Sequence, residues 1–504
     1  MSEKVTAATD PPAALETTIL RGSGLTLAGT AVGGAVAFFN EILLARSLGA
    51  STYGLFSLAL VLARIAHGLS LFGLQAAILH YLPIHRRDGR SDQVGGTILA
   101  ALALPAALAL AASGLLRLLA PWLANDVFGK PAAEVYIRLL AIAVPLMAMS
   151  EVLALLARGL GYARYYVLVS TLTPPLVLLA LLLLIHAAGA GPYWICRAVG
   201  AAYGTAAVIG LLCVLVAAGP EVRRTRPRFA FGALYRYGFP VLLGTSLYLV
   251  MEWADILLLG RFVAADEVGV YRACVQICTV FDMIIFATNL AAVHVFPVLE
   301  HERRFEERNQ TFRQVTLIIL LLSAPVFLLL TLHAKAALAL LGPKFANGAT
   351  ALLILATGRL LRNGLGTAAF VLILSGRQAT ETRNAAAASA TNLALNLALI
   401  PLFGLIGAAV ATTAAEIALN LLRVWLVRRL MQLHAPWRLL LRMVLVGGAA
   451  TLLLALAHRA LGSDQASPIG LLVAAGLDGI LLLAALWLFG IEREDRRFLK
   501  GAKP

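Results

Sequence analysis

Charged residues are scarce in this chain of 504 residues. Asp, Glu, Lys and Arg together make up 13% of it, apolar residues make up 60%, and the mean hydropathy is +0.86. Soluble domains carry about 25% charged residues, so a soluble globular protein is excluded. Fourteen membrane-crossing helices of roughly 20 residues would use about 280 residues. The remaining residues, about 224, are divided among many loops and two tails. No sizeable domain outside the membrane is therefore expected.

Cysteine is also scarce, which excludes a disulfide framework. The chain has four cysteines, at positions 196, 213, 274 and 278. Cys274 and Cys278 are four residues apart on an expected span, with no histidine close by. We therefore expect all four to be small buried apolar residues rather than metal ligands or redox centres.

The apolar stretches lack the period-two alternation of barrel strands and are nearly continuous, as in Ile98–Leu116. This pattern predicts an all-α polytopic membrane protein. Residues 1–21 are polar and show no features of a cleaved signal peptide. The expected spans are 22–44, 53–82, 94–116, 136–157, 166–187, 195–217, 239–260, 268–297, 315–333, 348–374, 385–401, 405–427, 439–458 and 469–490.

The net charge of +15 is spread over short loop clusters, so membrane topology explains it better than nucleic-acid binding. Of the 41 Lys and Arg, 27 fall in the two tails and the even-numbered loops, and 10 fall in the odd-numbered loops. Cytoplasmic loops retain positive charge, so we expect both termini in the cytoplasm.

An internal repeat relates the two halves of the chain. Asn40–Arg46 followed by Tyr53–Phe56 matches Ala254–Arg261 followed by Val268–Tyr271, with an offset of 214 residues between Glu41 and Asp255. Such parallel repeats bind substrate between lobes near the midplane of the membrane. The predicted division is a tail (1–21), an N-lobe (22–217), a basic loop (218–238), a C-lobe (239–427), two appended spans (428–490) and a charged tail (491–504).

Ionisable residues inside spans are costly, and each is a functional candidate by default. Guanidinium groups lining a water-filled cavity suit a phosphate or pyrophosphate, and acids there can bind a coupling cation or balance the arginines. The candidates for substrate binding are Arg64, Tyr248, Arg359, Arg362 and Asn363, and those for ion coupling or charge balance are Glu41, Glu252, Asp255 and Asp282. Glu416, Asn420 and Arg423 follow helical spacing and are interpreted as a packed polar stripe, and Asp478 as facing a neighbouring helix.

Several local motifs resemble one known group of transporters. Leu43–Gly49 with Tyr53–Phe56 is similar to the start of the polysaccharide-exporter branch of the multidrug/oligosaccharidyl-lipid/polysaccharide (MOP) flippase superfamily. Ser375–Arg377, Asn392–Pro401 and Phe403–Thr412 resemble spans 11 and 12 of that branch. Related lipid II flippases carry an arginine just before the span 1 acid, where this chain has Asn40.

The resemblance implies two six-helix lobes around a central cavity and alternating access. It implies a flippase that moves an undecaprenyl-pyrophosphate-linked oligosaccharide from the inner to the outer leaflet of a bacterial cytoplasmic membrane, for cell-surface polysaccharide biosynthesis. Coupling to a Na⁺ or proton gradient, no cofactor, contact with membrane lipids and cooperation with polysaccharide polymerase machinery are further expectations.

Two alternatives remain open. A multidrug/cation antiporter of the same superfamily has an acid-rich cavity, against which the arginines and the two extra spans argue. A membrane glycan polymerase or ligase needs a large outer loop, and the longest expected one, residues 117–135, has no histidine. With no nucleotide-binding loop or metal cluster in the sequence, a transporter is expected rather than an enzyme.

Overall fold

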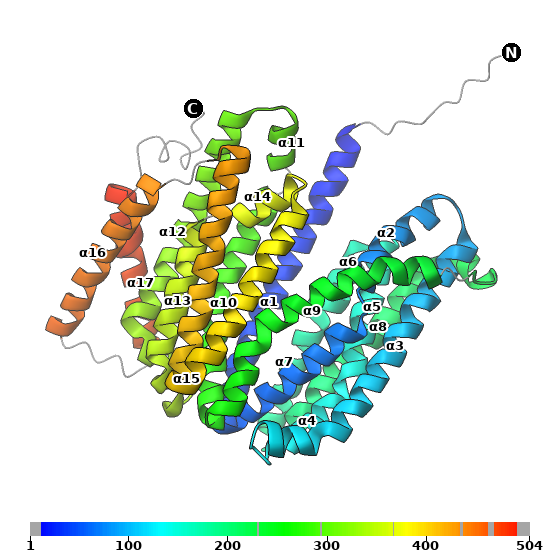
Figure 1. Cartoon of the computed structure of the whole chain (residues 1–504), viewed down its shortest axis with the longest axis horizontal. Coiled ribbons are helices and arrows are strands. Elements are labelled where there is room, and N and C mark those ends of the chain that lie inside the picture. The colour runs from blue at the N-terminus through cyan, green and yellow to red at the C-terminus, as the bar shows by residue number, and fades with distance from the viewer. Residues whose placement is uncertain are drawn as a thin grey trace. The chain divides into compact units, whose positions relative to one another are not determined.

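The computed structural model describes residues 12–228, 231–292, 295–365, 367–433, 437–461 and 468–490. Every regular element in these ranges is a helix, which confirms the all-α class (Figure 1). The helices are α1 (Pro12–Ser70), α2 (Leu74–Arg87), α3 (Ser91–Trp122), η1 (Leu123–Val127), α4 (Ala133–Ala141), α5 (Ala143–Gly159), α6 (Ala163–Tyr166), η2 (Val167–Leu172), α7 (Thr173–Ala187), α8 (Pro192–Arg224), α9 (Phe231–Phe262), α10 (Ala265–Ala292), α11 (Val295–His301), α12 (Phe305–Ala339), η3 (Pro343–Gly348), α13 (Ala349–Gly364), α14 (Ala368–Leu374), α15 (Gln378–Met431), α16 (Trp437–Leu461), α17 (Pro468–Ala485) and η4 (Leu486–Gly490).

Each of the fourteen expected spans overlaps these helices. Eight helical stretches among the described residues are long and apolar enough to cross a membrane, and two of them cover a pair of expected spans each. The chain is therefore a multi-pass membrane protein.

Two glycines interrupt the longest helices. A straight α1 of 59 residues would be about 88 Å long, about three times the hydrocarbon thickness of a bilayer. Gly49 in α1 and Gly404 in α15 have φ angles of 69° and 55°. This left-handed conformation suits glycine and breaks the helix. Both breaks fall between two expected spans, so each long helix is a pair of membrane-crossing segments.

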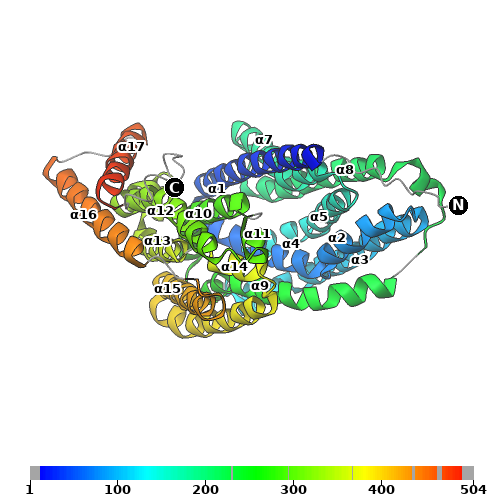
Figure 2. The same cartoon turned by 90° about the horizontal axis from the view of Figure 1, so that it is seen from above.

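The residues cluster into two compact units that interleave along the chain. Unit 1 comprises Met1–Asn40, Ala63–Leu118 and Arg138–Leu243, and unit 2 comprises Glu41–Leu62, Leu119–Ile137 and Gly244–Pro504. Within unit 1, α5 packs on α2 and α8, and α7 packs on α8. Within unit 2, α13 contacts α10, α12 and α15, while α16 and α17 contact α12 (Figures 1 and 2).

Large apolar side chains cover the outer sides of many helices. Leu118 is 80% exposed, Leu402 73% and Val216 67%. Such exposure would cost free energy in water, whereas lipid tails are as apolar as these side chains. The helix surfaces are therefore suited to lipid.

The cysteines lie in apolar surroundings. Cys196, Cys274 and Cys278 are buried, Cys213 is half-buried, and all four are free thiols. The Cys274 thiol donates to the carbonyl oxygen of Gly348 at 3.4 Å. The three buried thiols fit the packing role expected for them.

The two turns matched by the internal repeat lie against each other inside unit 2. A Cβ atom on Gly54 would lie 1.8 Å from the carbonyl oxygen of Ala265, and one on Gly269 would lie 2.0 Å from that of Ala50. Since real Cβ atoms do not approach oxygen so closely, both positions need glycine. The crossing of α1 over the start of α10 depends on this pair.

Gly54→Ala should destabilise the protein because the added methyl group forces α1 and α10 apart. We expect a lower midpoint of thermal unfolding in detergent, measured by intrinsic fluorescence. Gly114→Ala on α3 is the matched control, since a Cβ there meets nothing within 4 Å and alanine favours a helix by about 1 kcal/mol. Equal midpoints for the two variants would contradict the close approach.

Candidate functional site

Four charged side chains form a cluster inside unit 2. Arg359 and Arg362, one turn apart on α13, face Asp282 on α10 and Glu416 on α15. Arg359 Nη1 lies 2.6 Å from Glu416 Oε1 and 3.5 Å from Asp282 Oδ1. Arg362 also pairs with Asp282, and its Nη1 lies 4.0 Å from Glu416 Oε1. We call these four residues the α13 cluster.

The α13 cluster is electrically balanced. Two guanidinium groups and two carboxylates sum to zero, so each charge is compensated where desolvation would otherwise cost several kcal/mol per ion. The arginine side chains are 16% and 17% exposed, whereas that of Asp282 is 39% exposed. Asp282 is thus the member most open to its surroundings, and the arginines lie behind it.

Asn363 follows directly on α13 but serves packing. Its side chain is fully buried, and its Nδ2 donates to the carbonyl oxygen of Phe281 at 3.1 Å and to Ser323 Oγ at 3.0 Å. These bonds tie α13 to α10 and α12. The structure therefore gives Asn363 a role in positioning α13 and leaves it no contact surface for a ligand.

A second buried ion pair joins the two repeat halves within unit 2. Arg272 Nη2 on α10 donates to Glu41 Oε1 on α1 at 3.3 Å, and Tyr53 Oη donates to Glu41 Oε2 at 2.8 Å. The Arg272 guanidinium also lies over the Trp253 ring, 5.3 Å from its centroid. Glu41 is thus held by one cation and one hydroxyl group.

Asp255 is held in the same manner as Glu41. It is 6% exposed, accepts a hydrogen bond from Tyr271 Oη at 2.6 Å, and accepts another from the backbone N–H of Ile256 at 2.8 Å. Glu41 and Asp255 are the acids matched by the internal repeat, and each bonds a tyrosine from the next membrane-crossing segment. No ion pair of Asp255 is recorded among the described residues, which distinguishes it from Glu41.

Among the predicted site residues of unit 2, Glu41, Glu252 and Asp255 form no ion pair with the α13 cluster in the described part of the chain. Arg64 is half-buried in unit 1, and Glu252 is exposed on α9. The side chain of Tyr248 lies outside the described part of the structure. Of the nine candidates, Arg359, Arg362 and Asp282 lie in direct contact.

Two important partners were missed from sequence. Glu416 was interpreted as part of a packed polar stripe, yet it pairs with Arg359, while Arg423 at the other end of that stripe pairs with Glu381. Arg272 lies in the expected span 268–297 and was not named as a candidate, yet it is buried in α10 and pairs with Glu41. The available signal was the presence of an ionisable residue within each span, which predicts a partner without identifying it.

Asp478 does face a neighbouring helix, as predicted. Its Oδ2 lies 2.9 Å from His333 Nε2 on α12.

At one end of unit 2, a lysine closes the turn after η1. Lys130 Nζ donates to the carbonyl oxygens of Gly260 at 2.5 Å and Phe128 at 3.3 Å. Burial, and then the nearby charge of Arg261, lower the pKa of Lys130. Its hydrogen bond to Gly260 fixes this turn to the end of α9.

Two curated proteins are similar to this chain in sequence. An uncharacterized membrane protein of Methanocaldococcus jannaschii is 23% identical over 441 residues, which cover 82% of this chain and 84% of that protein. The "Probable flippase AglR" of Haloferax volcanii is 26% identical over 243 residues, 46% of this chain and 50% of that protein.

Solved transporter structures share the fold. A lipid II flippase MurJ in an inward closed conformation matches with a TM-score of 0.71 at 13% identity, over 95% of this chain and 99% of that one. An inward-facing multidrug resistance MATE family transporter of the MOP superfamily matches with a TM-score of 0.63 at 15% identity, over 79% and 94%.

The helical architecture and these likenesses show that the chain has the fold of these transporters. The family model described as "Polysaccharide biosynthesis protein" matches residues 19–301, more than half of the chain. The chain belongs to this polysaccharide biosynthesis protein family.

The buried pair of Glu41 and Arg272 should behave as a coupled unit. Glu41→Gln and Arg272→Met should each lower the thermal unfolding midpoint in detergent, because each leaves an uncompensated buried group, at a cost of about 3–5 kcal/mol. The double variant should lose less than the sum of the two. Arg304→Gln, which breaks an exposed pair with Glu307, should change the midpoint little. Additive losses at Glu41 and Arg272 would contradict the coupling.

Proposed function

We propose that this chain is a lipid-linked oligosaccharide flippase, and that its cargo is an undecaprenyl-pyrophosphate-linked glycan carried from the inner to the outer leaflet. Family membership supports the polysaccharide pathway. The relatives whose names include flippase support lipid-linked cargo. The single observation that supports a pyrophosphate is the pair of guanidinium groups one turn apart on α13 inside the spans.

The balance of the α13 cluster dictates how an anion would bind. Asp282 and Glu416 already accept hydrogen bonds from Arg359 and Arg362, and both carboxylates repel a pyrophosphate. An anionic head group would engage these donors when a carboxylate moves away or takes up a proton. We infer that the head group exchanges with Asp282, the more exposed of the two acids.

This exchange provides a route to ion coupling. A carboxylate released from an arginine in a low-dielectric site gains a proton or a cation, because an isolated buried charge is expensive. Glu41 and Asp255, both held by tyrosines, are the other acids that we infer to exchange an ion, whereas Glu252 is exposed on α9. Either a Na⁺ or a proton gradient would then drive lobe movement without a cofactor.

We infer from the Lys and Arg bias that both termini lie in the cytoplasm of a bacterial host. In that orientation the even-numbered loops face the enzymes that build the lipid-linked glycan. Polysaccharide polymerase machinery would act on the cargo at the opposite side.

Deletion of the gene should cause lipid-linked oligosaccharide to accumulate on the cytoplasmic face, with loss of surface glycan. The measurement is extraction of lipid-linked sugars together with a membrane-sidedness assay. Normal surface glycan with raised sensitivity to cationic drugs would favour the antiporter instead.

Arg359→Ala/Arg362→Ala should reduce glycan export by at least about 100-fold at normal membrane levels. The two guanidiniums each offer charge-assisted hydrogen bonds worth about 1.5–3 kcal/mol. Asp282→Asn/Glu416→Gln should have the opposite effect on binding and raise affinity for a polyprenyl pyrophosphate, because the competing charges are gone. Arg377→Ala is the control, since that exposed arginine bonds the carbonyl oxygen of Leu430. Unchanged binding in both double variants would overturn the pyrophosphate assignment.

Asp255→Asn should abolish the dependence of transport on an imposed Na⁺ or proton gradient in proteoliposomes. The amide keeps the hydrogen bond to Tyr271 but cannot exchange a proton or carry charge. Glu252→Gln, at the exposed position three residues earlier, should keep that dependence. Wild-type transport indifferent to both gradients would exclude coupling.

A further inference from the structure

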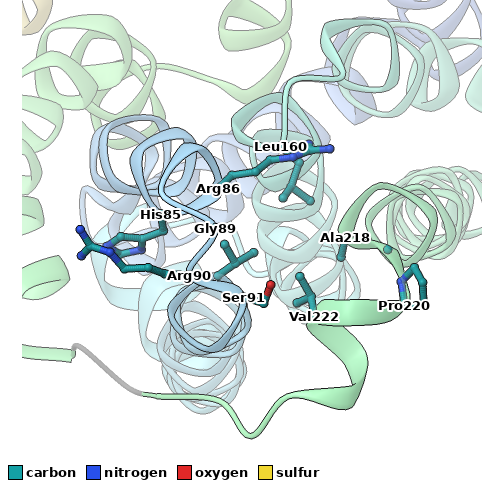
Figure 3. Close-up of a pocket in the computed structure, with 11 residues that line it drawn as sticks. His85, Arg86, Gly89, Arg90, Ser91, Leu160, Ala218, Pro220 and Val222 are labelled. Atoms are coloured by element: carbon teal, nitrogen blue, oxygen red, sulfur yellow. The ribbon is translucent and has the colours of Figure 1, made fainter. Parts of the chain in front are cut away.

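Unit 1 contains a small basic pocket that plays no part in the function proposed above. It has a volume of about 320 Å³, at the lower end of ligand pockets, which run from about 300 to about 1,000 Å³. Figure 3 shows its lining: His85 and Arg86 at the end of α2, Arg90 in the following turn, Ser91 at the start of α3, and Ala218 and Val222 where α8 is interrupted. Every lining residue belongs to unit 1.

The polar groups of this pocket are mainly donors. Arg86 donates no hydrogen bond and forms no ion pair within the described part of the chain, while Arg90 pairs with Asp88 at 2.5 Å and donates to Gln93 at 3.3 Å. His85 is 9% exposed, and its Nδ1 lies 3.2 Å from Thr97 Oγ1. Asp88 is already paired with Arg90, and Asp92 also lies near His85.

The Arg86 side chain extends to a tyrosine between α5 and α6, and these two helices carry two further arginines. The Arg86 guanidinium lies over the Tyr162 ring at 5.3 Å, and the Arg164 guanidinium approaches the same ring at 6.0 Å. Arg158 stacks over Tyr166 at 5.2 Å. Within the described ranges, none of these three guanidiniums pairs with a carboxylate. Arg86 and Arg164 at the Tyr162 ring, together with Arg158 at the Tyr166 ring, concentrate positive charge that favours binding of an anion.

The setting indicates the kind of anion. Tyrosines gather where a membrane helix meets the head-group layer, and the loops that carry Arg86 and Arg164 are those predicted to face the cytoplasm. Basic pockets between membrane-crossing helices on that side bind anionic head groups. Arginine also matches phosphate geometry through paired N–H donors.

We propose that this pocket is a binding site for a phosphate group, supplied by the head group of an anionic phospholipid. Arg86, which has no carboxylate partner among the described residues, would contact the phosphate oxygens, and the Ser91 hydroxyl, which also lines the pocket, would be a further donor. Bound there, a lipid would join the end of α2 to the start of α3 and to the end of α8. The proposal does not depend on the identity of the transported glycan.

The test uses the full-length protein and native mass spectrometry, with phosphatidylglycerol added to a phosphatidylcholine background. Arg86→Gln should weaken retention of phosphatidylglycerol about fivefold, since one basic residue near an anionic surface contributes about 1 kcal/mol. Arg87→Gln removes the same charge from the neighbouring position, which does not line the pocket, and should change retention less than twofold. Equal losses in the two variants would show general surface attraction and overturn the site.

A third variant keeps the charge and fills the space. Ala218→Phe should abolish selective retention of phosphatidylglycerol without removing any cation. If retention survives this change in a folded protein, as judged by size-exclusion chromatography, the pocket is not the site. If Ala218→Phe does not fold, the comparison of Arg86→Gln with Arg87→Gln still decides.

Competition with inorganic phosphate distinguishes the two sources of a phosphate group. Millimolar phosphate should leave bound phosphatidylglycerol in place when the acyl chains contribute to binding. A soluble ligand would be the source if inorganic phosphate displaces phosphatidylglycerol and also protects the wild-type protein, but not Arg86→Gln, against thermal unfolding. The pocket would then still be a phosphate site. No protection by phosphate and no preference for phosphatidylglycerol over phosphatidylcholine would overturn the proposal.

Discussion

A charge placed among membrane helices needs a partner that compensates it, and the interior of unit 2 is organised around that requirement. Asp282 and Glu416 compensate Arg359 and Arg362, and Glu41 compensates Arg272. Because an unpaired ion would cost several kcal/mol, these contacts fix which helices are neighbours. Asn363 reinforces the arrangement by bonding α13 to α10 and α12.

A balanced cluster is also one whose partners can be exchanged. A carboxylate and a phosphate compete for the same guanidinium donors, so the contacts that stabilise this state are those that an anionic head group would replace. Glu41 and Asp255 could exchange partners in the same way, one in each half of the repeat. Each accepts a hydrogen bond from a tyrosine of the next membrane-crossing segment. Stability and transport would therefore use the same few side chains.

The sequence predicted much of the candidate site, but not its pairing. Helical spacing places Arg359 and Arg362 on one face of α13, and the cost of buried charge identified Asp282 and Asp255 as significant. It could not assign Glu416 to Arg359 or Arg272 to Glu41, because the partners lie 57 and 231 residues apart. Periodicity describes a single helix face and carries no information about which distant helix covers it. The full burial of Asn363 could not be predicted for the same reason, since burial depends on neighbours.

The sequence by itself determined the apolar segments, their helical form and the intervals between segments in which Gly49 and Gly404 lie. These are local consequences of backbone hydrogen bonding in lipid and of glycine's freedom at positive φ. Only the tertiary structure decided that Glu41–Leu62 belongs with unit 2, that Gly54 and Gly269 bring the two repeat turns together, and that α2, α3 and α8 enclose a basic pocket. Those outcomes depend on side-chain packing between segments that are far apart in the chain. Which segments pack together is decided only in the complete fold, because each segment can pack against several others.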